Sequence, residues 1–111
     1  MTESQLQQTC VRWFRYQFSY AAPFLIAVPN GGRRDAKTGA LMKKEGALAG
    51  VADLILFDPL ARQLPLFIEM KKADGRQSES QVLFERTYTQ AGYTYRVCRS
   101  FEEFEQVVTE Y

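Results

Sequence analysis

Residues 50–71 read GVADLILFDPLARQLPLFIEMK and contain two short apolar runs separated by a turn signal. The runs cover residues 52–57 and 66–70, and Asp58-Pro59 begins the segment between them. Aliphatic and aromatic runs of this length, bounded by turn residues, are typical of β-strands. The segment therefore predicts a β-hairpin in the middle of a sheet.

The hairpin would bring three charged side chains together. If it is centred near Ala61, Asp53 lies opposite Glu69, and the alternation of a strand puts Lys71 on the same face as Glu69. Opposed side chains lie about 5 Å apart, and two carboxylates that close are destabilising unless a cation neutralises them. Mg²⁺ and Mn²⁺ prefer such oxygen ligands. The pattern indicates a metal site beside a lysine, and a chance set of strand charges is the alternative.

Four motifs of the chain follow one another in a distinctive order. They are residues 28–33 (VPNGGR), residues 49–53 (AGVAD), residues 68–71 (IEMK) and Gln81 on the next helix. In this order they resemble the VRR-NUC family of the PD-(D/E)xK nuclease superfamily, in particular its short stand-alone members from bacteriophages and bacteria. The resemblance runs over nearly the whole chain.

The resemblance implies a role for each matching position. Asp53 and Glu69 would be metal-binding carboxylates, with the backbone carbonyl of Met70 as a further ligand. Lys71 would orient or activate the attacking water, and Gln81 would complete the catalytic site. The activity implied is that of a DNA endonuclease that hydrolyses phosphodiester bonds with Mg²⁺ or Mn²⁺ as cofactor.

Two positions depart from the family pattern. Many members have proline where this chain has Ala52, a change that leaves Asp53 in place but loosens the start of the strand. Members often carry a glutamate on the first helix where this chain has Gln7. A glutamine amide oxygen can coordinate a metal but brings no charge, so the sequence leaves open whether one metal or two bind.

Gln81 has a second explanation. Ser78 and Gln81 match a capping box, in which the glutamine satisfies a backbone amide at a helix start. From the residues alone, this structural role is favoured over a catalytic one. Glu3 is likewise explained more simply as a favourable charge on a first helical turn. Gln7 lies close to the apolar stripe of the same helix and is therefore able to face the site.

A basic stretch before the hairpin is the candidate DNA-binding surface. Residues 33–44 contain five basic side chains and one acidic one, whereas residues 101–111 contain four glutamates and no basic residue. Glycine-containing backbone approaches a partner closely, and guanidinium groups bind phosphates. A solvated surface loop is the alternative. The predicted nucleic-acid-binding residues are Asn30, Gly31, Gly32, Arg33, Arg34, Lys43 and Lys44, the last two flanking the metal.

Composition fits one small enzyme domain. The 111 residues are 46% hydrophobic, which is enough for a modest core, so we expect residues 1–111 to form a single domain. A net charge of +1 excludes the overall basicity of a coat or packaging protein. Histidine is absent, which excludes a histidine-bound zinc, a Ser-His-Asp triad and a His-metal nuclease.

The remaining periodicity completes an α/β fold. Stripes and caps predict further strands over residues 24–28 and 93–98, and helices from residue 2 to the stretch before Pro23, over 41–49, over 78–92 and from 100 onward. The β-helix-β connection from residue 66 to residue 98 favours parallel pairing. We expect a restriction-endonuclease-like core, in which helices flank a mixed β-sheet with a central hairpin.

The two cysteines and the lack of targeting signals indicate an intracellular protein. Cys10 and Cys98 lie in apolar periodic segments and are expected to be buried thiols in a reducing compartment. No signal peptide is recognisable, and no apolar run approaches the roughly 20 residues that cross a bilayer. We predict a cytoplasmic location in a bacterial or phage-infected cell, without membrane contact.

Assembly and substrate follow from size and apolar surplus. One site makes one cut, so symmetric cleavage of a duplex or junction needs two sites, which a homodimer supplies. Aromatic residues on the terminal helices exceed what so small a core buries, namely Tyr16, Phe18, Tyr20 and Tyr111. Together with the resemblance, this predicts a homodimer on branched DNA such as a four-way (Holliday) junction. The alternatives are a non-catalytic nucleic-acid-binding subunit and a protein-interaction module of a replication complex.

Overall fold

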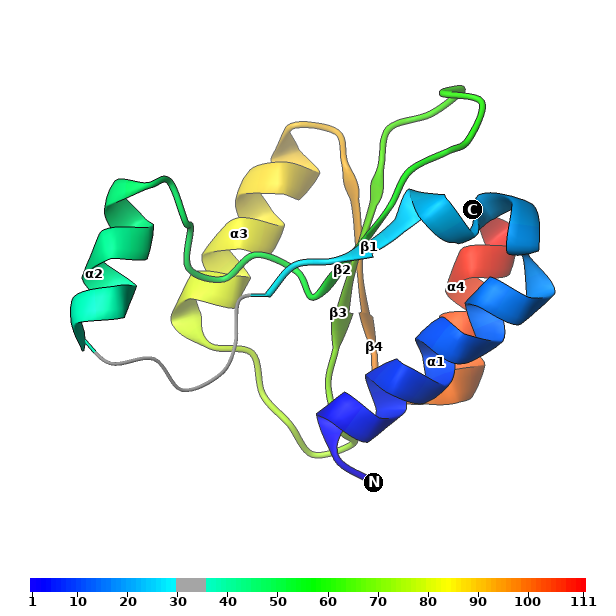
Figure 1. The fold of residues 1–111 in the computed structure, drawn as a ribbon, viewed down its shortest axis with the longest axis horizontal. Helices are drawn as coiled ribbons and strands as arrows, with labels where there is room; N and C mark the ends of the chain where they lie inside the picture. The colour runs from blue at the N-terminus through cyan, green and yellow to red at the C-terminus, as the bar shows by residue number, and fades with distance from the viewer. Residues whose placement is uncertain (30–35) are drawn as a thin grey trace.

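A computed structural model describes residues 1–29 and 36–111. The elements in chain order are α1 (Glu3–Gln17), the 3₁₀ helix η1 (Ser19–Phe24), β1 (Leu25–Ala27), α2 (Ala36–Lys44), β2 (Leu54–Leu56), β3 (Leu66–Met70), α3 (Glu79–Gln90), β4 (Thr94–Cys98) and α4 (Phe101–Glu110). The strands form one sheet in the order β1-β2-β3-β4, with helices on both faces (Figure 1). No helix in these residues is long and apolar enough to cross a membrane.

The sheet is mixed, as predicted. β1 pairs with β2 and β2 with β3 in antiparallel orientation, which confirms the central hairpin. β3 pairs with β4 in parallel orientation, so α3 is the crossover helix between them. The predicted α/β fold with a mixed sheet is therefore confirmed.

The apolar side chains of the sheet divide into two cores. α1 and α4 cover one face, where Leu66, Ile68 and Met70 pack with the α1 stripe of Leu6 and Cys10. α3 covers the other face, where alternation turns Phe67 toward an aromatic cluster. Every residue of β3 is buried because both of its faces are covered (Figure 1). β3 is thus the most buried of the strands described, and it carries Glu69.

The helices begin where the capping residues predict. Thr2 caps α1 and Ser78 caps α3, each with a complete capping box, and the Ser100 side chain accepts a hydrogen bond from the Glu103 amide at the start of α4. Such caps satisfy backbone amides that have no partner within the helix. Side-chain chemistry at the first turn therefore sets the starts of α1, α3 and α4.

Two predicted helix limits are wrong. α1 ends at Gln17 and a 3₁₀ helix continues to Phe24, with Pro23 inside it, instead of one α-helix up to Pro23. The helix expected over residues 41–49 lies earlier, over Ala36–Lys44. The chain leaves the helix at Gly46, whose φ of +106° is a left-handed conformation that glycine adopts readily.

Cys10 and Cys98 are buried free thiols, as predicted. Both are fully buried in the core between the sheet and α1. Burial raises the pKa of Cys10 to about 11, with a contribution from Glu102, and raises the pKa of Cys98 to about 12. Thiols with a pKa so far above neutral pH stay protonated, so they act as packing groups and not as nucleophiles.

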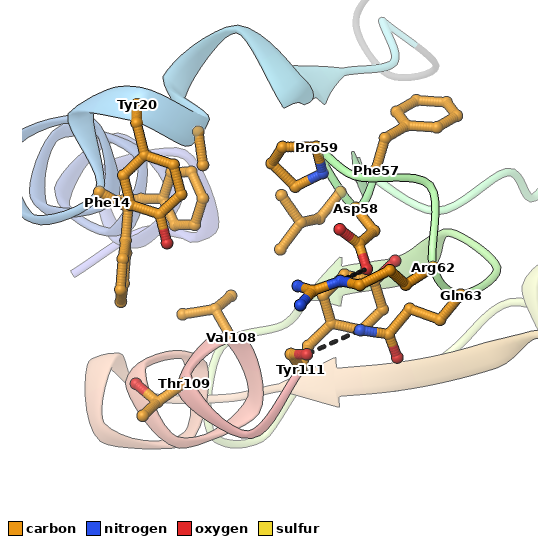
Figure 2. A pocket seen from close by; sticks show the side chains of 13 residues that line it. Phe14, Tyr20, Phe57, Asp58, Pro59, Arg62, Gln63, Val108, Thr109 and Tyr111 are labelled. Carbon is orange, nitrogen blue, oxygen red and sulfur yellow. Dashed lines mark hydrogen bonds and ion pairs between the residues drawn. The ribbon is translucent and has the colours of Figure 1, made fainter.

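The connection between β2 and β3 is held by a buried aspartate, Asp58. Its carboxylate accepts a hydrogen bond from the Leu60 amide at 2.9 Å and pairs with Arg62 at 3.2 Å. Asp58 and Arg62 line a small cavity of about 150 Å³. Figure 2 shows the pair beside Tyr111. The Leu60 amide and then Arg62 lower the pKa of Asp58 below its usual value. The charged carboxylate therefore stabilises the turn.

We predict that Asp58→Asn destabilises the protein at pH 7. A carboxylate with a lowered folded-state pKa contributes stability above its unfolded pKa, near 3.9, and loses it as pH falls through the folded value. The difference in free energy of unfolding between wild type and variant should therefore shrink below about pH 4. Urea denaturation across a pH series measures it. The exposed Asp74, 4.0 Å from Lys72, provides the control Asp74→Asn; a difference equal for both substitutions would contradict the role of Asp58.

Candidate active site

The hairpin register brings Asp53 to Glu69. Leu54 pairs with Ile68 and Leu56 with Leu66. Continuing this register by one residue places Asp53 opposite Glu69, the pairing expected from a turn centred near Ala61. Ala61 has a φ of +53°, in the left-handed region, at the tip of that turn. The strand geometry therefore follows the sequence prediction at the candidate site.

Asp53 is half-buried at the start of β2. Its Oδ2 accepts a hydrogen bond from the Met70 backbone amide at 2.7 Å, which fixes the carboxylate over the end of β3. Burial raises the pKa of Asp53, while the Met70 amide and the positive charge of Lys71 act in the opposite direction. The negative charge of Glu3 raises it further. A bound cation would therefore stabilise the charged form of Asp53.

Glu69 is a buried carboxylate with one partner. It is 1% exposed, and its Oε1 accepts a hydrogen bond from the Tyr95 hydroxyl at 2.8 Å. Its Oε2 is buried and has no hydrogen-bond partner among the described residues. Burial is the main cause that raises the pKa of Glu69, and the nearby charge of Asp53 adds to it. The nearby Gln77 side chain acts to lower the pKa of Glu69, although its amide nitrogen donates a hydrogen bond to Glu85 at 3.0 Å.

The unpartnered Glu69 oxygen fits a divalent cation. A buried carboxylate oxygen without a donor is costly, and a metal ion supplies the missing partner. Across residues 1–29 and 36–111, no three His, Cys, Asp or Glu side chains gather into a potential metal site. A cation here would therefore depend on two carboxylates, Asp53 and Glu69, and on uncharged oxygens such as the Met70 carbonyl.

Lys71 lies beside both carboxylates. It is 9% exposed, and its backbone amide donates to the Cys98 carbonyl at 3.0 Å at the end of β4. Its positive charge acts to lower the pKa of both Asp53 and Glu69. The structure therefore brings together the three charged side chains that the sequence singled out.

Gln81 acts as a helix cap in the structure. Its side-chain Oε1 accepts a hydrogen bond from the Ser78 backbone amide at 2.7 Å, and its backbone amide donates to the Ser78 hydroxyl at 3.2 Å. The start of α3 nevertheless lies against the segment that leads to Asp53, because a Cβ on Gly50 would collide with the Ser80 carbonyl oxygen. Gln81 is thus held near β2 by its own cap.

Two residues of α1 face the same place. Glu3 and Gln7 lie one helical turn apart and line a groove together with Asp53 and Met70. The sequence predicts that Gln7 is able to face the site, and it lies in the groove with Asp53. Glu3, which the sequence explained as a helix charge, also accepts a long hydrogen bond from the Lys72 amide at 3.4 Å. Its acidic side chain at the first turn of α1 therefore adds negative charge near Asp53.

Comparison with known proteins identifies the family. A family model for the VRR-NUC domain matches residues 1–102 of this chain. The chain belongs to the VRR-NUC family. A solved structure described as a VRR_NUC domain protein has a TM-score of 0.81 at 21% identity, with all of this chain and 88% of that one covered. A second, described as a VRR_NUC domain, has a TM-score of 0.62 at 17% identity and covers 100% of this chain and 99% of the other. No curated protein matches.

Membership of the VRR-NUC family implies a nuclease-type function. The two structural neighbours support the fold, and the family match covers the segments that carry Asp53, Glu69 and Lys71. The half-buried Asp53 and the buried Glu69 therefore lie in a domain of nuclease type.

The structure describes two of the predicted DNA-binding residues, Lys43 and Lys44 on α2. Asn30, Gly31, Gly32, Arg33 and Arg34 lie outside the described residues. Lys43 and Lys44 are exposed on α2, and Lys43 lines a different pocket, next to Val28, Phe84 and Tyr88. Neither lysine lines the groove that contains Asp53.

Tyr95 is the site residue that sequence reasoning missed. It lies on β4, where the parallel register pairs it with Phe67, two residues before Glu69. Its side chain reaches Glu69 because alternation places both on the α3 face of the sheet. A polar tip at an apolar strand position was the only available signal. The parallel pairing could be predicted, but not its register.

We predict that Tyr95→Phe lowers the free energy of unfolding by about 1–3 kcal/mol, because buried Glu69 loses its hydrogen-bond donor. Tyr88 stacks in the same aromatic cluster and gives the matched control Tyr88→Phe, which should change stability by less than about 0.5 kcal/mol. Urea denaturation at pH 7 measures both. Equal stability of the two variants would show that the hydroxyl contact does not support Glu69.

Proposed function

We propose that this VRR-NUC protein is a divalent-metal-dependent endonuclease that hydrolyses phosphodiester bonds in DNA. The observation that carries the proposal is the unpartnered buried Oε2 of Glu69, opposite Asp53 and beside Lys71. A protein that used this fold only for packing would gain from replacing a buried, half-satisfied carboxylate by an apolar residue. The arrangement is therefore better explained by chemistry than by stability.

The chain offers a ligand set and a charged partner for this reaction. Asp53, Glu69 and the Met70 carbonyl would hold Mg²⁺ or Mn²⁺, with Gln7 as a further oxygen on α1. Such a cation, when bound, polarises the phosphate and lowers the pKa of a water molecule. Asp53 is oriented by the Met70 amide and Glu69 by Tyr95, so both carboxylates are fixed before substrate arrives.

Lys71 has the charge that phosphodiester hydrolysis requires. The attacked phosphate gains negative charge in the transition state, and a buried ammonium group stabilises it more strongly than an exposed one. Lys71 would also position the attacking water at its Nζ. Gln81 would assist by holding that water, provided that its side chain leaves the Ser78 cap or uses its amide nitrogen.

We predict that DNA cleavage requires Mg²⁺ or Mn²⁺ and stops in EDTA. Glu69→Gln removes a charged ligand and Lys71→Ala the stabilising ammonium, so each should reduce cleavage about 100-fold or more. Glu69→Gln should also weaken Mn²⁺ binding by the free protein, measured by calorimetry. DNA binding in EDTA should persist in both variants.

Glu79→Gln is the matched control, because Glu79 is exposed in the first turn of α3. It should cleave DNA and bind Mn²⁺ like the wild type. Undiminished cutting by Glu69→Gln or Lys71→Ala, or cutting in EDTA, would remove the catalytic assignment. In that case the alternative function is a non-catalytic subunit that grips nucleic acid through Arg33, Arg34, Lys43 and Lys44.

The proposed substrate is branched DNA, cut by a homodimer. Tyr16 and Tyr20 are 87% and 75% exposed near the end of α1, and such aromatic surface often marks an interface. Phe18 and Tyr111, expected to belong to the same surplus, instead pack against the core, and the Tyr111 hydroxyl donates to the Leu64 carbonyl at 2.7 Å. The aromatic surface available for dimerisation is therefore smaller than expected.

We predict a mass of twice 12.8 kDa by light scattering at micromolar concentration, and faster cleavage of a four-way junction than of linear duplex. Tyr16→Ser with Tyr20→Ser should weaken the dimer without unfolding the monomer, because both side chains are largely exposed. Thermal unfolding checks the fold of the variant. A monomeric wild type that cuts both substrates at equal rates would contradict both parts of the prediction.

A further inference from the structure

The groove along α1 holds basic residues that the proposed chemistry does not use. We infer that this groove is the track for the DNA strand that is cut, with Arg12 and Arg15 as phosphate contacts. The inference rests on the proposed nuclease function, because it assigns the approach path of the substrate to the same Asp53 site.

The groove reaches one side of the candidate active site, where Asp53 and Met70 line it but Glu69 and Lys71 do not. Its volume is about 770 Å³, and Asp53, Met70 and Ala27 form its sheet side. Seven residues of α1, from Glu3 to Arg15, form the helix side. They form two adjacent rows with a spacing of four residues, which places them on one face of the helix. A chain lying along α1 would therefore pass directly over Asp53.

The charges of the groove are arranged by position. Glu3 and Asp53 lie at one end, where a divalent cation would offset their charge. Arg12 and Arg15 lie toward the other end of α1, both exposed. Neither arginine forms an ion pair with a residue in the described part of the chain. Two unneutralised guanidinium groups in a groove that leads to a phosphodiester-cutting site match the charge of a DNA backbone.

The dimensions fit a short length of one strand. Arg15 lies eight residues beyond Gln7, which is about 12 Å along the helix axis. A DNA strand in a duplex advances about 3.4 Å per nucleotide, so this length spans three to four nucleotides. Phosphates on one side of the cut would then contact Arg12 and Arg15 while the scissile phosphate lies at Asp53.

A purely structural role explains one arginine but not the other. Arg15 lies in the last turn of α1, where positive charge interacts favourably with the helix dipole. Arg12 lies before that turn, and on the solvated surface of an isolated helix it would gain from an acidic neighbour one turn away. The residues three and four positions away are Gln8, Thr9, Arg15 and Tyr16, none of which is acidic. Arg12 is therefore the more informative residue for the test.

The test measures DNA binding in EDTA, so that it does not depend on metal or cleavage. The probes are a fluorescein-labelled 12-nucleotide single strand and the duplex of the same sequence, titrated by fluorescence anisotropy over a series of KCl concentrations. The proteins are wild type, Arg12→Ala, Arg15→Ala, the double variant and Arg86→Ala. Arg86 is the matched control, an exposed helical arginine on α3, on the other face of the sheet (Figure 1).

We expect the double variant to bind the single strand at least about tenfold more weakly. Loss of two phosphate contacts should reduce the slope of log K against log salt by about 1.4 on single-stranded DNA. Arg12→Ala alone should account for about half of this change, and Arg86→Ala should match wild type. In Mg²⁺, the arginine variants should raise KM more than they lower kcat, because they remove binding at a distance from the reacting phosphate.

The outcomes separate the inference from the proposed function. If wild type cuts DNA but the double variant keeps the wild-type salt slope, or if Arg86→Ala loses as much binding, the groove is not the track. If wild type neither binds nor cuts DNA, the proposed function fails and the inference fails with it. Thermal unfolding checks that the variants are folded, and Arg12→Gln with Arg15→Gln repeats the test with longer polar side chains.

Discussion

The burial of Glu69 is the constraint around which the structure is arranged. β3 is covered on both faces, so a carboxylate on it loses its water and requires partners from the protein or from a ligand. Tyr95 supplies one hydrogen bond and leaves the second oxygen of Glu69 unpartnered. A buried carboxylate oxygen without a donor costs free energy that an apolar side chain at this position would not. The apolar packing of two helical layers thus creates the electrostatic demand that a metal and a lysine can meet.

The topology of the sheet determines which groups lie close to Glu69. The antiparallel pairing of β2 and β3 brings Asp53 to the end of β3, where the Met70 amide fixes it. The parallel pairing of β3 and β4 brings Tyr95 from the far side of the α3 crossover. Gly50 allows the start of α3 to lie against the backbone before β2, since any side chain there would collide with Ser80. The local hairpin therefore brings Asp53 to Glu69, and the long-range crossover brings Tyr95 to the same carboxylate.

The sequence could predict the parts of the site that depend on local pattern. The register of Asp53 and Glu69 follows from two apolar runs and one turn, and Gln7 follows from the stripe of the first helix. Tyr95 could not be predicted, because the register of a parallel pair depends on how the crossover helix packs and not on a turn. The predicted end of α2 is wrong because glycines end helices in general and the sequence offers two, Gly46 and Gly50. Only tertiary contacts show that Gly50 is used for packing against α3.

Net charge hides the electrostatics of this small domain. A value of +1 suggests weak attraction to a polyanion, yet α1 carries acid at its first turn and arginines farther along the same face. Neutralising the acidic end would leave α1 with net positive charge, because Arg12 and Arg15 have no acidic partner among the residues described. Affinity for a nucleic acid would then be coupled to occupancy of the carboxylate site, since a cation there removes the charge that repels the scissile phosphate. The same coupling, read in the other direction, means that a bound DNA strand would favour cation binding at Asp53 and Glu69.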